Sequence, residues 1–171
     1  SKDTSQLKTF KKCLGLKNKI SLKKSGYTGK KDCSYVQFGN VILYKWLVGI
    51  GLMPNKSKRI GSLKIPNKYF FDFLRGHIDG DGDFSVFWDS VYPKSRRLYI
   101  RFCSASLTHI EWSRQRIDSI LGIDGFIEKR EDINYLKFAK NDSLKLLPRL
   151  YYTKNIPYLK RKYNIIKEFL K

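Results

Sequence analysis

Hydrophobic residues recur along this chain with two spacings, and each spacing predicts one kind of secondary structure. Apolar positions three and four residues apart are typical of a helix with one buried face, and strict alternation is typical of a half-buried strand. The helical spacing predicts helices over residues 5–16, 41–52, 108–121 and 143–151, and another that starts near Pro157. The alternating spacing predicts strands over residues 19–24, 34–38, 83–89, 98–104, 126–129 and 134–138. Helices interspersed with hairpins indicate the α+β fold class.

Another helix begins near Tyr69 and has an unusual composition. Its apolar face, at the helical spacing, consists of Phe70, Phe73, Leu74, His77 and Ile78. Gly76 and Gly80 lie four residues apart and therefore on one side of the helix. A glycine in a helix interior costs about 1 kcal/mol relative to alanine, so a pair of them indicates close approach of another backbone. We therefore expect Gly76 and Gly80 to form a helix–helix interface.

Three acids, Asp79, Asp81 and Asp83, occur where this helix is expected to end. The negative end of a helix dipole disfavours carboxylates unless a cation binds there. Hard divalent cations such as Mg²⁺ prefer carboxylate oxygens. The pattern therefore indicates a metal site at the helix end, and the alternative is a helix C-terminus that continues into an ordinary Asp-Gly turn.

The balance of charge indicates a polyanionic partner. The chain has 35 Lys and Arg against 15 Asp and Glu, a net charge of +20 over 171 residues. The basic residues are spread over the whole chain instead of forming a tail, while 42% hydrophobic and 15% aromatic residues indicate a folded domain. A folded domain with this excess is typical of nucleic-acid binding. A lysine-rich composition without function explains part of the excess.

Other features argue against several classes of site and location. Cys13, Cys33 and Cys103 form no Cys-x-x-Cys pair, so neither a zinc site nor a disulfide framework is supported. Two histidines are too few for a histidine-based metal site. The longest apolar run, residues 41–53, is interrupted by Lys45 and is too short to span a bilayer, and there is no secretory signal. We expect a soluble, intracellular protein.

Two parts of the chain match each other. The residues 14–16 and 35–38, Leu-Gly-Leu and Tyr-Val-Gln-Phe, correspond to the residues 121–123 and 135–138, Leu-Gly-Ile and Tyr-Leu-Lys-Phe. Each copy has the predicted order helix, strand, strand, helix, which implies two similar lobes related by a pseudo-dyad. In the first copy we expect a turn at residues 25–29 and core positions at Trp46 and Leu47.

With this repeat and the segment from Leu74 to Gly82, Leu-Arg-Gly-His-Ile-Asp-Gly-Asp-Gly, the chain resembles LAGLIDADG homing endonucleases. The resemblance covers nearly the whole chain. It implies an αββαββα repeat with a curved antiparallel DNA-binding sheet over residues 67–171. It also implies a partial αββα first repeat, which lacks its motif helix, over residues 1–66. The implied function is a site-specific, metal-dependent double-strand DNA endonuclease, which is intracellular and associated with DNA.

The resemblance also implies roles for individual residues. Asp81 corresponds to the essential acid, which would bind Mg²⁺ or another divalent cation beside the scissile phosphodiester. Lys56 and Lys162 correspond to supporting lysines that would offset the charge developing on the phosphate. Asp79 is interpreted as mainly structural, and Asp83 is open to either role. The candidates for base or phosphate contacts are Arg97, Tyr99, Arg101, Lys129 and Lys137.

The chain departs from the family in having one motif helix where the family uses two. A homodimer could supply the second helix through Gly76 and Gly80, or these residues could be the back part of a two-motif protein, which the incomplete first repeat favours. The competing function is binding without cleavage, by an intron maturase or by a domesticated DNA- or RNA-binding protein on the same scaffold. Retention of Asp81 and Lys162 favours a nuclease.

Overall fold

The computed structural model describes residues 3–24 and 32–170 and divides the chain into two compact units, Ser1–Leu43 and Tyr44–Lys171. The predicted turn at residues 25–29 lies outside the described residues. Among the helices that the structure describes, none is both long enough and apolar enough to cross a lipid bilayer.

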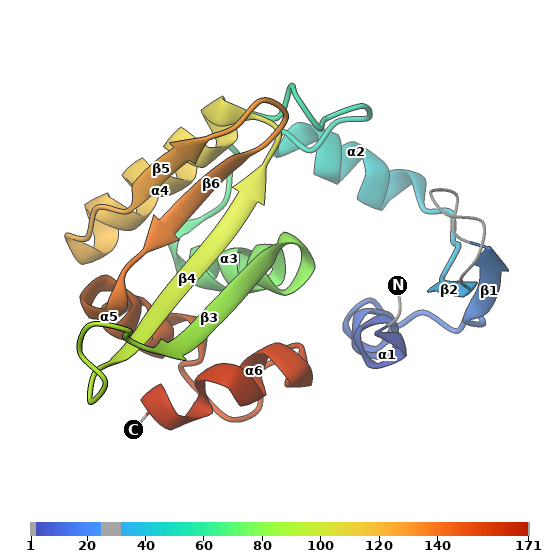
Figure 1. Cartoon of the computed structure of the whole chain (residues 1–171). Coiled ribbons are helices and arrows are strands. Elements are labelled where there is room, and N and C mark those ends of the chain that lie inside the picture. The colour runs from blue at the N-terminus through green and yellow to red at the C-terminus, as the bar shows by residue number, and fades with distance from the viewer. Residues whose placement is uncertain (1–2, 25–31, 171) are drawn as a thin grey trace. The chain divides into compact units, whose positions relative to one another are not determined.

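The first unit contains helix α1 (Thr4–Cys13) and an antiparallel hairpin of strands β1 (Ser21–Lys24) and β2 (Asp32–Tyr35) (Figure 1). The helix ends before Gly15, whose φ of 62° is the left-handed conformation that glycine adopts without strain. Phe10 of α1 contacts the ring of Phe38, with centroids 5.9 Å apart. No residue of α1 is buried, so this unit has little core of its own.

Helix α2 (Val41–Gly49) crosses the boundary between the two units. It begins where the side-chain oxygen of Asn40 accepts a hydrogen bond from the backbone N–H of Leu43, at 2.9 Å. Its residues are apolar almost all round, which is typical of a buried helix. None of them is buried: Trp46 is 58% exposed and Leu47 is half-buried, so the prediction of core positions at Trp46 and Leu47 is wrong. The pattern predicts the helix, but burial requires a covering element, and the described residues provide none.

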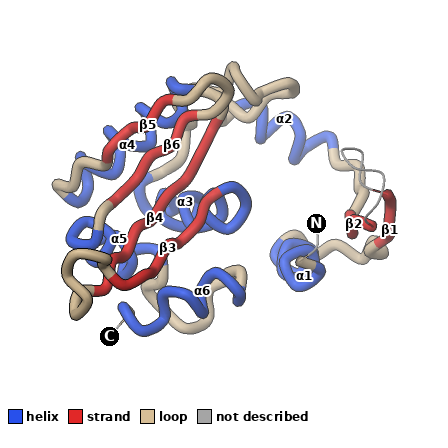
Figure 2. The backbone as a smooth tube through the Cα atoms, in the orientation of Figure 1, coloured by secondary structure: helices blue, strands red, loops and turns tan. Residues whose placement is uncertain are grey.

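A four-stranded antiparallel sheet organises the second unit (Figure 2). Its order is β3-β4-β6-β5, and its strands are β3 (Gly82–Trp88), β4 (Arg96–Ser104), β5 (Phe126–Lys129) and β6 (Asn134–Phe138). Phe84 pairs with Ile100, which in turn pairs with Phe138. These alternate positions are buried, so one face of the sheet forms the core and the other is available to solvent.

Helices α3 (Asn67–Asp81), α4 (Leu107–Leu121) and α5 (Lys140–Leu150) cover the buried face (Figure 1). They contribute Leu74, Ile78, Ile110, Ile117, Leu146 and Leu147, all fully buried, to a core that also contains Leu98, Phe102 and Leu136 of the strands. Helix α6 (Lys160–Ile166) and the short 3-10 helix η1 (Lys167–Phe169) follow, and Ile166 joins the same core.

The segment before α3 belongs to the second unit and packs against its helix α4. Ile60 and Leu63 are buried, and the carbonyl of Gly61 accepts a hydrogen bond from His109 Nδ1 at 2.9 Å. Arg116 donates to the carbonyl of Ile65 at 2.7 Å. The compact unit therefore begins at Tyr44, whereas the repeats are predicted to meet after residue 66. The division into repeats concerns similarity of sequence and stays a prediction.

The strand registers agree with the alignment of the two copies. In the first hairpin Ser21 pairs with Tyr35, and in the second Glu128 pairs with Tyr135, which is the partner expected from the sequence match. The helices before both hairpins also end alike, because Gly122 after α4 has a φ of 60°, close to that of Gly15. The resemblance between the copies therefore extends to backbone conformation.

Candidate active site

The three acids at the end of α3 lie in three different environments. Asp79 is 4% exposed, and one of its oxygens accepts the backbone N–H of Leu159 at 2.9 Å. Asp83, in β3, forms a bidentate ion pair with Arg101, whose Nε lies 2.8 Å from Oδ1. Asp81 is the last residue of α3 and is exposed, and no described side chain pairs with its carboxylate. Asp81 is thus the acid left available for a ligand.

Asp79 has a structural environment. Burial raises the pKa of its carboxyl, while the hydrogen bond from Leu159 and nearby cations act in the opposite direction. Its second oxygen is buried and has no partner among the described atoms. This hydrogen bond links the start of α6 to the end of α3, and the structural role of Asp79 stays a prediction.

Lys162 of α6 contacts the end of α3. It is 5% exposed, and its Nζ donates to the carbonyls of Ile78, Asp79 and Gly82 at 2.6, 2.8 and 2.6 Å. The last carbonyls of a helix lack partners within the helix, and a cation is favourable at that end. Burial lowers the pKa of Lys162, and the neighbouring aspartates oppose this shift. Lys162 therefore supports the turn that presents Asp81, and its predicted catalytic role stays a prediction.

Arg75 is a third buried charged residue beside Asp79 and Lys162, and its role was not predicted from the sequence. Arg75 is 3% exposed and donates to the carbonyls of Leu150 and Pro157 at 2.9 and 2.8 Å. It also pairs with Asp72 at 2.6 Å. The sequence did offer a signal for this role. Arg75 and Asp79 lie four residues apart among the apolar positions of one helix, and charges buried there need polar partners.

A cavity of about 400 Å³ opens beside Asp81. Lys56, which the sequence places 25 residues before Asp81, lines the same cavity, so the structure brings these two predicted residues to one site. Lys162 does not line it. Within the described parts of the chain, no group of three or more His, Cys, Asp or Glu residues could hold a metal ion. Asp81 alone would therefore supply only part of a coordination shell.

Two histidines form part of the cavity wall, and their role was not expected. His77 Nε2 lies 3.1 Å from the carbonyl of Cys103, and because a carbonyl only accepts, this nitrogen carries the proton. The rings of His77 and His109 are 5.4 Å apart. Burial lowers the pKa of both imidazoles. The neutral rings pack with Phe73 and shape the cavity beside Asp81.

Gly76 and Gly80 lie on an exposed part of α3. A Cβ atom at either position would meet nothing within 4 Å among the described atoms. Tyr69, which is 52% exposed, and Phe73 continue the same side of the helix at spacings of four, three and four residues. The glycines therefore leave a smooth surface that no described residue covers, and their role as an interface stays a prediction.

The candidate nucleic-acid residues mostly share the solvent face of the sheet. Arg97, Tyr99 and Arg101 alternate with buried residues of β4, and Lys137 pairs opposite Arg101. Lys129 pairs with Asn134, which is buried on the same side of β6 as Leu136 and Phe138. Paired residues lie on the same face of a sheet, so Lys129 lies on the helix-covered face and not on the solvent face. Four of the five predicted residues are therefore brought together, and one is separated from them.

The cations on this face are held by acids. Arg97 pairs with Asp89, Arg101 with Asp83, and Lys137 with Glu128. Lys137 is the main cause of a lowered pKa at Glu128. The pairs fix the orientation of the donors and reduce the net positive charge on this face. Sequence reasoning could not see these pairs, because their partners depend on strand register.

No family model matches this chain, and no curated protein matches it. Several solved structures do. The meganuclease I-SmaMI, solved bound to uncleaveable DNA, aligns with a TM-score of 0.62 and 20% identity over 99% of this chain and 75% of its own. The I-LtrWI LAGLIDADG homing endonuclease bound to target DNA aligns with a TM-score of 0.54 and 16% identity over 99% and 76%.

A third structure, the homing endonuclease I-CvuI, aligns over 60% of this chain with a TM-score of 0.43 and 24% identity, and the chain spans 64% of its length. The fuller alignments show that this chain has the LAGLIDADG homing endonuclease fold. The predicted resemblance and the predicted α+β class are confirmed at the level of the fold.

Proposed function

We propose that this chain is the DNA-binding and metal-binding part of a site-specific DNA endonuclease that hydrolyses phosphodiester bonds. The main support is that Asp81, alone among the three acids at the end of α3, is exposed and unpaired within the described structure. A carboxylate at the negative end of a helix is stabilised by a cation. The likeness in fold to I-SmaMI, solved with DNA, supports nucleic acid as the partner.

A divalent cation fits this position only with ligands from elsewhere. Asp81 would supply one carboxylate, and phosphate oxygens, water and a second acid from outside the described residues would complete the shell. I-SmaMI has also been solved with uncleaved DNA in the presence of calcium ions. A bound cation would activate water and stabilise the leaving oxygen. Lys56 would face the phosphate across the cavity, and Lys162 would hold the turn on which Asp81 lies.

The second acid requires a second helix against α3. The exposed side formed by Gly76 and Gly80 would accept it, from a second copy of this chain or from a preceding segment of a longer protein. A Cβ atom at Gly76 would meet no described atom within 4 Å, so Gly76→Leu is expected to abolish association while leaving the monomer folded. Sedimentation of the two proteins measures this, and unchanged association would remove the glycines from the interface.

The solvent face of the sheet would bind duplex DNA in the major groove. Arg97, Tyr99, Arg101 and Lys137 point from this face, and their paired acids would hold the donors in orientations suited to base edges. Lys129, on the other face, is proposed to contact a phosphate. Binding by this face does not itself require cleavage.

The second candidate function is therefore binding without cleavage, as an intron maturase or as a domesticated DNA- or RNA-binding protein. One observation favours it: the described residues provide a single unpaired acid at the site and no complete metal cluster. The two functions share the sheet and differ only in whether Asp81 acts on a bound phosphate. They are separated by measuring cutting and binding on the same substrate.

The test is incubation of the chain with a randomised duplex library and Mg²⁺, followed by sequencing of defined double-strand breaks. Asp81→Asn keeps the shape of the side chain and removes its charge, so cutting should disappear while binding is unchanged or slightly tighter. Asp118→Asn, at an exposed acid of α4, is the matched control and should cut like the parent. Cutting by Asp81→Asn at the parental rate would refute the assignment, and specific binding with no cutting by the parent would establish the second candidate.

A further inference from the structure

A groove of about 310 Å³ lies between helices α3 and α5, which cover the buried face of the sheet. The residues that line it include Lys68, Phe71, Asp72, Arg149 and Tyr152. They come from the first half of α3 and from the end of α5 with the segment that follows it. Asp81 is the last residue of α3, so the groove and the candidate active site lie toward opposite ends of this helix.

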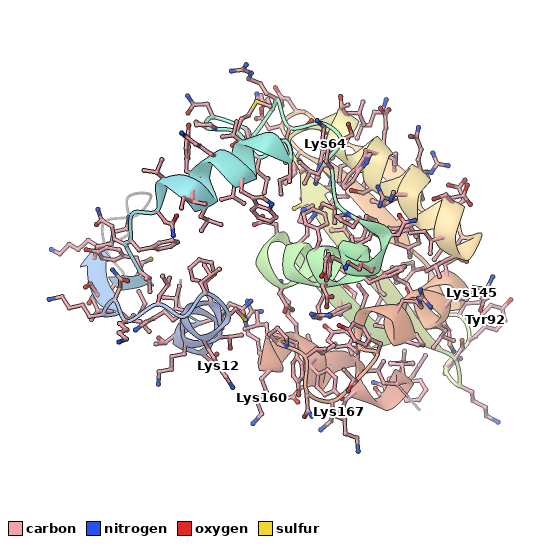
Figure 3. All side chains as sticks on the ribbon, turned by 180° about the vertical axis from the view of Figure 1, so that it is seen from behind. Lys12, Lys64, Tyr92, Lys145, Lys160 and Lys167 are labelled. Atoms are coloured by element: carbon pink, nitrogen blue, oxygen red, sulfur yellow. The ribbon has the colours of Figure 1, made fainter. Side chains whose placement is uncertain are left out.

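Three cations at or beside the groove are exposed and have no acidic partner. Lys68 belongs to α3, while Lys145 and Arg149 lie four residues apart and therefore on one side of α5. None of the three forms an ion pair with another residue that the structure describes. Lys145 extends outward from α5 (Figure 3). The cations of the solvent face of the sheet are paired with acids, so those of the groove are more available to an anion.

The acid that lines the groove fixes an aromatic ring in place. Asp72 Oδ1 accepts a hydrogen bond from Arg75 Nη2 at 2.6 Å and another from the hydroxyl of Tyr152 at 3.0 Å. Arg75 is 3% exposed, and its guanidinium lies over the ring of Tyr152, 5.9 Å from the ring centre. Tyr152 is nevertheless 57% exposed. The ring is thus held from the protein side and remains open to solvent.

Arg149 provides a second planar group at the groove. Its guanidinium lies 5.0 Å from the ring centre of Phe71, which is 7% exposed, while Arg149 itself is exposed. Bases stack on guanidinium planes as well as on aromatic rings. Tyr152 and Arg149 therefore offer two supported planar surfaces beside unpaired cations.

We propose that this groove binds single-stranded nucleic acid, with bases stacked on Tyr152 and Arg149 and with phosphates beside Lys68 and Lys145. Basic grooves that contain exposed aromatic rings are the arrangement with which proteins bind single strands. A duplex keeps its bases stacked and paired, so an unpaired base is the one that reaches a ring at the protein surface. The net charge of +20 favours a polyanion over a protein partner. The proposal does not depend on duplex binding by the solvent face of the sheet.

The strand could come from RNA or from locally unpaired DNA, which share phosphates and bases. The experiment therefore uses two dye-labelled probes, a short oligouridine and a short oligothymidine, and follows binding to the whole chain by anisotropy over a range of salt concentrations. The variants are Tyr152→Leu, Tyr152→Phe and Lys68→Gln/Lys145→Gln. The matched control, Lys94→Gln/Lys160→Gln, removes the same charge at two exposed lysines that do not line the groove. All of the substituted side chains are exposed, and thermal unfolding checks that each variant is folded.

The two kinds of variant should have different signatures. Tyr152→Leu should weaken strand binding about fivefold to 150-fold through the loss of one stacked base, with an unchanged salt dependence. Tyr152→Phe keeps the ring and should bind like the parent. Lys68→Gln/Lys145→Gln should reduce the salt slope by about 1.4, because each phosphate contact on a single strand contributes about 0.7. The control should keep the parental affinity and slope.

A strand that carries 5-iodouracil, cross-linked by light and analysed by mass spectrometry, should be attached at Tyr152. Binding of either probe with this pattern supports the groove, and the tighter probe identifies the source of the strand. Parental affinity in Tyr152→Leu, or equal losses in the two lysine variants, would overturn the proposal. Failure of the parent to bind either probe would also overturn it, while duplex binding and cleavage by the same protein would leave the proposed function standing.

Discussion

The two copies of the repeat contain corresponding elements with different degrees of burial. In the second copy α5 buries Ser143, Leu146, Leu147 and Leu150 against the rest of its unit. In the first copy α2 is the more apolar helix in sequence, yet none of its residues is buried. The hairpins have the same register and the preceding helices end at the same kind of glycine. Equivalent elements therefore form in both copies, while only one copy forms a core.

The second copy packs against the elements that precede it. Helix α3 and strands β3 and β4 provide Leu74, Ile78, Leu98 and Phe102, against which α4 and α5 pack. In the second copy the local pattern specifies the helices, and their burial comes from contact with α3 and the sheet.

The largest expected effect on stability comes from shortening one apolar side chain in each of the corresponding helices α5 and α2. Leu147→Ala removes a fully buried side chain of α5 and should lower the free energy of unfolding by roughly 2–5 kcal/mol. Ile42→Ala in α2, where the side chain is 82% exposed, should change it by less than about 0.5 kcal/mol. Urea denaturation of both variants measures the difference. A large loss from Ile42→Ala would mean that α2 is covered in solution.

The next effect concerns the polar junction that only the second copy has. Lys162→Met leaves three carbonyls, two of them in buried hydrogen bonds, without their donor and should lower the free energy of unfolding by roughly 1–3 kcal/mol. Lys160→Met, at an exposed lysine of the same helix, should be close to neutral. Thermal unfolding separates the two. If Lys162→Met were as stable as the parent, the lysine would not support the end of α3.

Acid should weaken the second unit, because both histidines of the chain lie there. Burial lowers the pKa of His77 and His109 in the folded state, so below pH 6.5 the unfolded chain binds protons that the folded chain does not. Their contribution is complete above the unfolded pKa and is lost as pH falls toward the folded values. The slope is at most about 1.4 kcal/mol per pH unit for each histidine.

Unfolding measured across this range should show the loss, and His77→Phe, which keeps an aromatic ring beside Phe73, should reduce it. The unfolding free energy of the variant should therefore vary less between neutral and mildly acidic pH than that of the parent. An identical pH dependence in both proteins would mean that His77 does not cause the acid sensitivity.

The smallest expected effect is a change in the salt dependence of duplex affinity, which distinguishes the two hairpins by the pairing of their lysines. Lys23 of β1 is exposed and lies over the ring of Tyr35, without an acidic partner in the described structure, whereas Lys137 of β6 pairs with Glu128. Duplex affinity should fall by about 10³ to 10⁵ between 50 and 200 mM salt if six to ten phosphates are contacted. If Lys23 contacts a phosphate, Lys23→Gln should reduce the slope by about 0.9. Lys137→Gln should reduce it less, and equal reductions would show that the ion pair opens on DNA.

Most elements could be predicted from sequence because their signals are local. The strands over residues 126–129 and 134–138 agree with β5 and β6, and the helix over 108–121 differs from α4 by one residue. The error at Trp46 has a different cause, since its burial depends on a partner element and not on its own neighbours in sequence. Local periodicity therefore predicted the kind of element more reliably than its burial.

The spacing of glycines and acids located the end of α3. The resemblance assigned Asp81 to metal binding and Asp79 to a structural role, and these assignments stay predictions. What distinguishes Asp79, Asp81 and Asp83 is a contact made by Leu159 and another made by Arg101, both remote in sequence. The same holds for Lys162, whose three acceptors lie 80 or more residues away. Roles that depend on such contacts become visible only in the folded chain.

The shared register of the two hairpins makes them interchangeable parts. Ser21 with Tyr35 and Glu128 with Tyr135 occupy equivalent pairs, so transplanting the outward-facing residues of one hairpin onto the other would keep each inward position unchanged. If the outward faces of both hairpins contact DNA as proposed, exchanging their outward-facing residues should alter the contacts with DNA while the backbone pairing is kept. The left-handed glycines Gly15 and Gly122 mark equivalent points before the two hairpins.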